Sequence, residues 1–198
     1  MRTPPRVMPA LVTPFTGDGE LDLESHRHNL RTLAQDGING FLVAGSTGEG
    51  AYLEPGEREE LIRAAREELG RRPFLLGGVV AETERAARVQ LAEVEAGGAD
   101  GALVITPTTL VRNRHTLVER FYTDLADDAP VPLMLYSVPS YTAYALPAEV
   151  AVELSAHPAI VGMKDSGGDP VRMGDLVAGC AHGFFLFCGS SAALSQAV

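Results

Sequence analysis

The stretch 133–166, LMLYSVPSYTAYALPAEVAVELSAHPAIVGMKDS, contains one complete copy of the pattern on which the fold prediction rests. Its two ends, 133–138 and 160–166, are predicted strands, and they are almost continuously apolar, as strands covered on both faces are. Between them Val150 and Leu154 share one face of a predicted helix. A strand, a helix and a second strand in this order predict a parallel βαβ unit.

The same alternation extends in both directions along the chain. Further strands are predicted at residues 7–12, 40–44, 74–80, 102–106 and 184–188, with amphipathic helical patterns between them. The count is seven βα units, the seventh helix barely begun where the sequence stops. No linker or shift in composition divides the chain, so we expect a single domain over residues 1–198.

Repeating βα units predict a parallel α/β fold, either an open doubly wound sheet or a (β/α)₈ TIM barrel. A complete barrel takes about 250 residues. The favoured prediction is therefore a TIM barrel that lacks its last βα unit, in a chain that is a fragment of a longer one. Such a barrel exposes the edges of its first and seventh strands, so we expect that a chain ending at Val198 is not a stable soluble monomer.

Composition and charge exclude several classes of function. With 45% hydrophobic residues the chain is too apolar to be disordered. A formal net charge of −10 argues against a nucleic-acid partner, which requires clustered cations. No apolar run approaches the roughly 20 residues that cross a bilayer, and the first residues lack the apolar region of a secretory signal. Two cysteines make no disulfide framework, so we expect a cytoplasmic protein without a membrane partner.

Lysine occurs once in the chain. Of the 16 basic residues, 15 are arginine and one, Lys164, is lysine. A GC-rich coding bias accounts for arginine wherever a generic positive charge is enough. A lysine that survives such a bias indicates a position where arginine does not serve. Arginine keeps its proton in proteins, whereas a buried lysine can become a neutral amine nucleophile.

The position of Lys164 in its predicted strand supports this interpretation. Alternation places Gly162, Lys164 and Ser166 on one face and Asp165 on the other. If the opposite face packs against helices, Lys164 points into the barrel near the strand's carboxyl end, where active residues of barrels gather. Desolvation there lowers a lysine's pKa, and the amine can form an imine with a ketone. The alternatives are a lysine that extends to solvent, or one paired with Asp165.

Two other strand ends carry polar groups. The loop 44–50, AGSTGEG, offers backbone N–H groups and two hydroxyls to an anion, although a plain tight turn has the same composition. Tyr136 ends the strand 133–138, where a tyrosine is either a catalytic group or a packing residue at the rim. No set of histidine, cysteine and aspartate has metal-ligand spacing, so no metal is expected. The charged run 54–68 is interpreted as a solvated helix face.

Three motifs occur in order at these strand ends: GSTGE at 45–49, YSVP at 136–139 and GMKDS at 162–166. Together they resemble the dihydrodipicolinate synthase / N-acetylneuraminate lyase family of class I pyruvate aldolases. The segment 157–169, with the preceding YSVP, is most similar to its 4-hydroxy-2-oxoglutarate aldolase branch. The resemblance implies a barrel followed by a C-terminal helical segment, assembled as a homo-oligomer, either a dimer or a tetramer.

The resemblance also implies roles for individual residues. Lys164 forms the imine with pyruvate or another 2-oxo acid, Tyr136 shuttles the proton, and Ser46 relays it. No cofactor is needed, because the protonated imine is itself the electron sink. The substrate-binding residues are Ser46, Thr47, Gly48, Gly162 and Ser166.

Two positions depart from the family pattern. Family members carry an aromatic pair after the Thr-Pro of the strand 102–106, where this chain has Thr108 and Thr109. Synthases of the lysine pathway carry an arginine two residues after the proline of YSVP, where this chain has Tyr141. The second departure counts against dihydrodipicolinate synthase itself.

The main hypothesis is therefore a Schiff-base lyase that cleaves or forms a C–C bond beside a 2-oxo acid, most similar to 4-hydroxy-2-oxoglutarate aldolase. The first alternative is a dihydrodipicolinate synthase-like enzyme, or another that condenses a 2-oxo acid through the same imine. The second is a non-catalytic paralogue or fragment that binds a 2-oxo acid.

Overall fold

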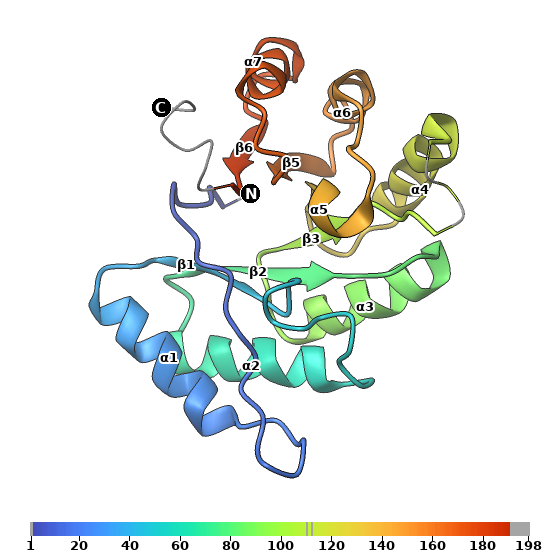
Figure 1. Cartoon of the computed structure of the whole chain (residues 1–198). Coiled ribbons are helices and arrows are strands. Elements are labelled where there is room, and N and C mark those ends of the chain that lie inside the picture. The colour runs from blue at the N-terminus through green and yellow to red at the C-terminus, as the bar shows by residue number, and fades with distance from the viewer. Residues whose placement is uncertain (1, 110, 112, 191–198) are drawn as a thin grey trace. The chain divides into compact units, whose positions relative to one another are not determined.

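The computed structural model describes residues 2–109, 111 and 113–190, in which helices and strands alternate (Figure 1). The strands are β1 Gly40–Val43, β2 Phe74–Val79, β3 Gly101–Ile105, β4 Leu133–Ser137, β5 Ile160–Asp165 and β6 Phe185–Cys188. The helices are α1 Leu23–Gln35, α2 Glu57–Leu69, α3 Glu84–Ala96, α4 His115–Asp127, α5 Pro139–Thr142, α6 Ala148–Leu154 and α7 Pro170–Gly179. The predicted start of a seventh helix falls on residues 191–198, outside the described part of the chain.

The strands follow one another in the sheet in the order of the chain, β1-β2-β3-β4-β5-β6. The pairs β1–β2, β4–β5 and β5–β6 are parallel. A doubly wound sheet reverses its strand order at a switch point, whereas a (β/α) barrel keeps the order of the chain. The predicted fold class, a TIM barrel represented by part of its strands, is confirmed.

One predicted strand, at residues 7–12, is wrong. Only an isolated parallel bridge forms there, between Ala10 and Leu42. Leu11 donates its N–H to the Leu42 carbonyl, and the Leu42 N–H donates to the Pro9 carbonyl. Pro9 has no N–H of its own, so it cannot contribute a donor to a continuing ladder. The segment therefore follows β1 without becoming a strand.

The chain divides into two compact units. The first comprises Met1–Val80 and Val89–Ala102, and the second Ala81–Arg88 and Leu103–Val198. The single domain predicted over residues 1–198 stays a prediction, and each unit is described by itself. In the first unit every residue of β1 and β2 is buried, and α1 packs on α2. The ion pairs Arg27–Glu67 and Arg31–Glu68 join these two helices.

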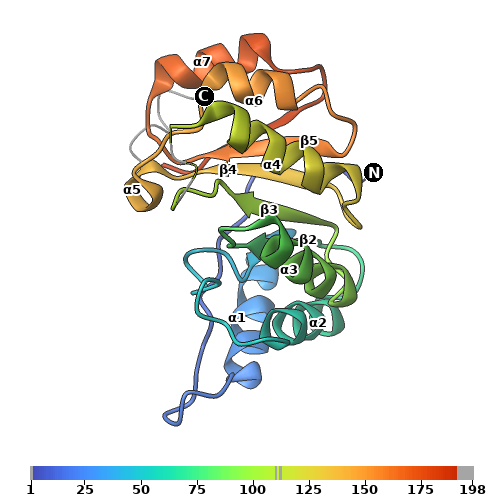
Figure 2. The ribbon, with the colours of Figure 1, turned by 90° about the vertical axis from the view of Figure 1, so that its right-hand side faces the viewer.

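The second unit builds its core around β4 and β5. Figure 2 shows α4, α6 and α7 together on one side of these strands. The apolar faces of the helices, with Leu125, Leu154 and Leu176 buried, cover that side. Burying a leucine side chain stabilises a fold by about 1.5–3 kcal/mol, so this layer fixes the strands that carry the predicted lysine and tyrosine. No helix in the described ranges is both long and apolar enough to cross a membrane.

Candidate active site

The strand β5 places Lys164 beside Tyr136 of β4. The two residues are partners in the parallel register, and the Lys164 Nζ lies 4.6 Å from the centroid of the Tyr136 ring. Desolvation by burial lowers the pKa of Lys164. The face of an aromatic ring attracts an ammonium group, so the ring of Tyr136 also helps to place the lysine. The result is a half-buried amine next to a phenol, rather than a lysine extended into solvent.

Asp165 points away from Lys164 and has partners of its own. Its side chain is 3% exposed and accepts hydrogen bonds from the Arg172 Nε at 2.8 Å and the Gly167 N–H at 2.9 Å. The alternation predicted for this strand therefore holds. An ion pair between Lys164 and Asp165 is excluded, and no carboxylate in the described part of the chain pairs with Lys164.

Gly189, which the sequence did not single out, lies against the lysine. A Cβ atom at this position would overlap the Ser166 Oγ and lie 2.8 Å from the Lys164 Cε. The Gly189 N–H donates to the Asp165 carbonyl at 2.7 Å, which holds the backbone in place. Any larger residue here would force the side chains of Lys164 or Ser166 to move. A glycine after a predicted strand is too common to be a signal by itself.

We predict that Gly189→Ala slows imine formation between Lys164 and pyruvate by roughly ten- to hundredfold. Overpacking costs about 1–3 kcal/mol, and each 1.4 kcal/mol is about tenfold in rate. The matched control is Gly174→Ala in α7, where an added Cβ meets nothing within 4 Å. Borohydride trapping rates of the two variants provide the measurement. Equal rates in both would show that Gly189 does not position the lysine.

Tyr136 is held from its other side by Thr106. The Thr106 N–H and hydroxyl both donate to the Tyr136 carbonyl at 3.0 Å. The same hydroxyl lies 3.0 Å from the Tyr122 hydroxyl, which donates to the Val104 carbonyl at 2.9 Å. Burial raises the pKa of Tyr122 far above its usual value, so this phenol stays protonated. The two hydrogen bonds from Thr106 fix the backbone from which Tyr136 projects.

Gly162 allows close packing within the sheet. A Cβ atom there would lie 2.6 Å from the Phe185 carbonyl oxygen and 2.7 Å from the Met134 Cε. Its neighbours are therefore strand β6 and a methionine side chain. Its predicted contact with a substrate stays a prediction.

The loop after β1, in the first unit, is a tight turn with two non-glycine residues at positive φ, Ala44 and Glu49. The N–H groups of Gly48 and Gly50 both donate to the Gly45 carbonyl at 3.0 Å. The N–H groups of Ser46 and Thr47 have no acceptor among the described residues, and Thr47 is exposed.

The hydroxyl of Ser46 adds a second unused group to this loop. Its Oγ is buried and has no hydrogen-bond partner within the described ranges. Buried polar groups are rarely left unpaired, and an exception calls for an explanation such as a ligand. The loop therefore retains two N–H groups and one hydroxyl for an anion. The binding of an anion by residues 44–50 stays a prediction.

Arg58 in α2 holds the backbone of that loop through hydrogen bonds. It is buried, donating from Nε to the Gly78 carbonyl at 2.9 Å and from a terminal nitrogen to the Gly50 carbonyl at 2.6 Å. Its other terminal nitrogen pairs with Glu93 at 2.8 Å. Desolvation lowers the pKa of Arg58, and the bond to Glu93 opposes that shift. The interpretation of the run 54–68 as a solvated face is wrong at this residue.

The structure therefore brings together Lys164, Tyr136 and Ser166 in the second unit. Ser46 and Thr47 lie in the first unit, and their meeting with Lys164 stays a prediction. Tyr141 stands where synthases of the lysine pathway carry an arginine, and it is 71% exposed in α5. No three His, Cys, Asp or Glu side chains in the described residues lie close enough to hold a metal ion.

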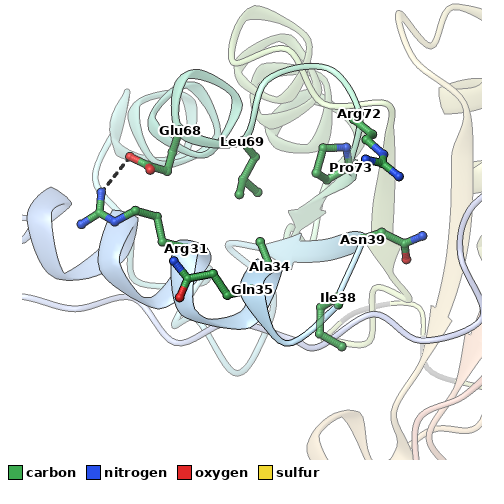
Figure 3. A pocket seen from close by; sticks show the side chains of 10 residues that line it. Arg31, Ala34, Gln35, Ile38, Asn39, Glu68, Leu69, Arg72 and Pro73 are labelled. Atoms are coloured by element: carbon green, nitrogen blue, oxygen red, sulfur yellow. Dashed lines mark hydrogen bonds and ion pairs between the residues drawn. The ribbon is translucent and has the colours of Figure 1, made fainter.

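The first unit also contains a cavity of about 530 Å³ between the C-terminal ends of α1 and α2 (Figure 3). The ion pair Arg31–Glu68 spans it, and Asn39 and Pro73 line it just before β1 and β2 begin. The cavity thus lies at the amino ends of these strands. Active sites of barrels form at the carboxyl ends, so it is not the candidate active site.

Comparison with known proteins gives concordant results. A family model described as "Dihydrodipicolinate synthetase family" matches residues 3–198. The 4-hydroxy-tetrahydrodipicolinate synthase of Methanoculleus marisnigri is 40% identical over 174 residues, covering 86% of this chain and 59% of that protein. The enzyme of the same name from Xanthomonas axonopodis pv. citri is 37% identical, covering 97% of this chain and 63% of that protein. The chain spans about three-fifths of the length of these curated relatives.

Solved structures share the fold. A dihydrodipicolinate synthase of Bacillus anthracis superposes with a TM-score of 0.89 at 24% identity, over 96% of this chain and 66% of that one. YagE, a prophage protein of the dihydrodipicolinic acid synthase family from E. coli K12 solved in complex with pyruvate, gives a TM-score of 0.86 at 28% identity. That match covers 92% of this chain and 62% of the other.

Proposed function

The chain belongs to the dihydrodipicolinate synthetase family, and from this premise we propose that it carries the imine-forming site of a class I lyase that acts on pyruvate or another small 2-oxo acid. One observation carries the proposal. The chain's single lysine is half-buried and desolvated, with its Nζ 4.6 Å from the ring of Tyr136. The pyruvate complex of YagE supports the substrate class.

The chemistry follows from these two side chains. The neutral Lys164 amine adds to the ketone carbon, and the carbinolamine loses water to give a protonated imine. That imine accepts the electron pair left when a C–H or C–C bond beside it breaks, which produces an enamine. Tyr136, whose ring lies beside the Lys164 Nζ, acts as the general acid–base group that moves the proton at the carbon and nitrogen. Ser46 relays that proton, and the free N–H groups of Ser46 and Thr47 bind the substrate carboxylate.

The names of the relatives favour a condensing synthase over the aldolase branch that the motifs alone had favoured. Both relatives compared above are 4-hydroxy-tetrahydrodipicolinate synthases. We therefore propose enamine addition to an aldehyde acceptor as the first candidate. Cleavage of a 4-hydroxy-2-oxoglutarate-type substrate is the second candidate. It is favoured by Tyr141, which stands where synthases of the lysine pathway carry an arginine. A homo-oligomeric state stays a prediction of the resemblance, and a cytoplasmic location stays a prediction of the composition and the cysteine count.

Borohydride trapping tests the proposal directly. Incubation of the chain with pyruvate and borohydride is expected to add one reduced pyruvate at Lys164, located by peptide mass spectrometry. Product analysis with aspartate semialdehyde and with 4-hydroxy-2-oxoglutarate then separates the two candidate reactions. Absence of any adduct at Lys164 in folded protein would leave the third hypothesis, a non-catalytic paralogue.

A further inference from the structure

The loop that follows β3 binds a carboxylate of this chain's own. The Glu82 Oε2 accepts hydrogen bonds from the N–H of Thr108 at 2.8 Å and the N–H of Thr109 at 2.7 Å. Its Oε1 lies 3.4 Å from the Thr108 hydroxyl. Partial burial raises the pKa of Glu82, but the hydrogen bonds from Thr109 and Thr108 outweigh it, and the pKa is lowered. The carboxylate is therefore ionised when it occupies this loop.

The donors belong mainly to the backbone. Two consecutive N–H groups that converge on one point form a concave anion site, and hydrogen bonds to an ionised acceptor are the stronger ones. Such a site recognises a carboxylate whether it comes from Glu82 or from a ligand. Thr108 and Thr109 have smaller side chains than the aromatic pair of the family pattern, so less bulk surrounds these N–H groups.

Among the described residues, only hydrogen bonds from the loop hold the Glu82 carboxylate. Its side chain is exposed, and no arginine or lysine in the described part of the chain pairs with it. The neighbouring acidic residue Glu84, by contrast, pairs with Arg88 at 2.9 Å. A glutamate that no cation holds is easier for another carboxylate to displace than one in an ion pair.

The loop lies near the proposed chemistry. Thr108 follows Thr106 by two residues, so their Cα atoms are at most about 7.6 Å apart. Thr106 holds the carbonyl of Tyr136, and the ring of Tyr136 lies under the Lys164 Nζ. The anion site therefore lies at the end of β3, next to the strand of Tyr136 and two strands from that of Lys164. Tyr141 offers no positive charge for a second carboxylate.

We propose that the N–H groups of Thr108 and Thr109 bind the distal carboxylate of the second substrate, and that Glu82 fills this site until the substrate displaces it. The inference rests on the proposed function and specifies its acceptor class. The acceptor carries a carboxylate several bonds from its carbonyl group. Glu82 is then a specificity-determining residue that competes with weakly bound anions.

Glutarate is the probe, because it carries two carboxylates and no carbonyl, so it cannot form an imine. Calorimetric titration of the full chain is expected to show about tenfold tighter glutarate binding in Glu82→Ala than in the unmodified chain, the scale of one charge-assisted hydrogen bond. Glu82→Gln, which keeps an acceptor oxygen but loses the charge, is expected to fall between them. Glu84→Gln is the matched control for net charge and is expected to leave glutarate binding unchanged.

Equal or weaker glutarate binding in both Glu82 variants would overturn the proposal and leave Glu82 as a residue that only orders the loop. The same gain in Glu84→Gln would overturn it too, because net charge would then explain the effect. Pyruvate trapping at Lys164 is measured in parallel on every variant. If the unmodified chain is not trapped by pyruvate and borohydride, the proposed function is refuted. The glutarate result tests the anion site independently.

Discussion

The Lys164→Arg variant is expected to form no borohydride-stable adduct with pyruvate at that position. The rate of adduct formation is expected to fall by at least about 10⁴-fold. Arginine keeps the length and the positive charge, but it does not release its proton and cannot act as the amine nucleophile. The fold is expected to survive, because the side chain is only half-buried and no carboxylate in the described residues pairs with it. Mass spectrometry after trapping, with a melting curve as the folding control, makes the measurement.

The chain's composition sharpens this test. Lys164 is the only lysine, so any adduct in the variant would have to lie on the N-terminal amino group. An adduct on that amino group, formed as fast as the adduct of the unmodified chain, would refute the role of Lys164.

The pH dependence of trapping in the unmodified chain has a definite sign. Burial lowers the pKa of Lys164, so trapping rises with pH and reaches half its maximum below the ordinary lysine value of about 10.4.

The fold was predictable because its signals are local and repeated. Strand β5 begins at the predicted residue and ends one residue before the predicted limit, because a buried strand is marked by its own apolar run. The alternation that separates Lys164 from Asp165 has the fixed period of two. The error at residues 7–12 has a local cause as well, since Pro9 interrupts the donors that a ladder needs.

The supporting residues of the site were not predictable, because their roles depend on partners distant in the sequence. Arg58 is buried through contacts with Gly50, Gly78 and Glu93, and a charged helical run shows none of these. Gly189 matters only because strand pairing brings it against Lys164. Motifs predict which groups react, whereas the residues that support those groups become visible only in three dimensions.

The Tyr136→Phe variant separates proton transfer from imine formation. Removing the hydroxyl keeps the ring that lies 4.6 Å from the Lys164 Nζ, so the lysine stays placed. A positioned acid–base group contributes about 10²–10⁴-fold, so exchange of the pyruvate methyl hydrogens in deuterium oxide is expected to slow by roughly that factor. This exchange passes through the enamine and needs no second substrate, so it is measurable by NMR before the acceptor is identified.

Tyr122→Phe is the matched control, because it removes the same hydroxyl from the neighbouring buried phenol. The Tyr122 hydroxyl hydrogen-bonds to Thr106 and to the Val104 carbonyl, so its loss removes buried hydrogen bonds and lowers stability by about 1–3 kcal/mol. Its exchange rate in folded protein is expected to stay within about threefold of the unmodified chain. If both variants slow exchange equally, the effect of Tyr136 is structural and the proton is carried elsewhere. If Tyr136→Phe alone slows exchange while borohydride still traps the imine, the phenol acts after the imine has formed.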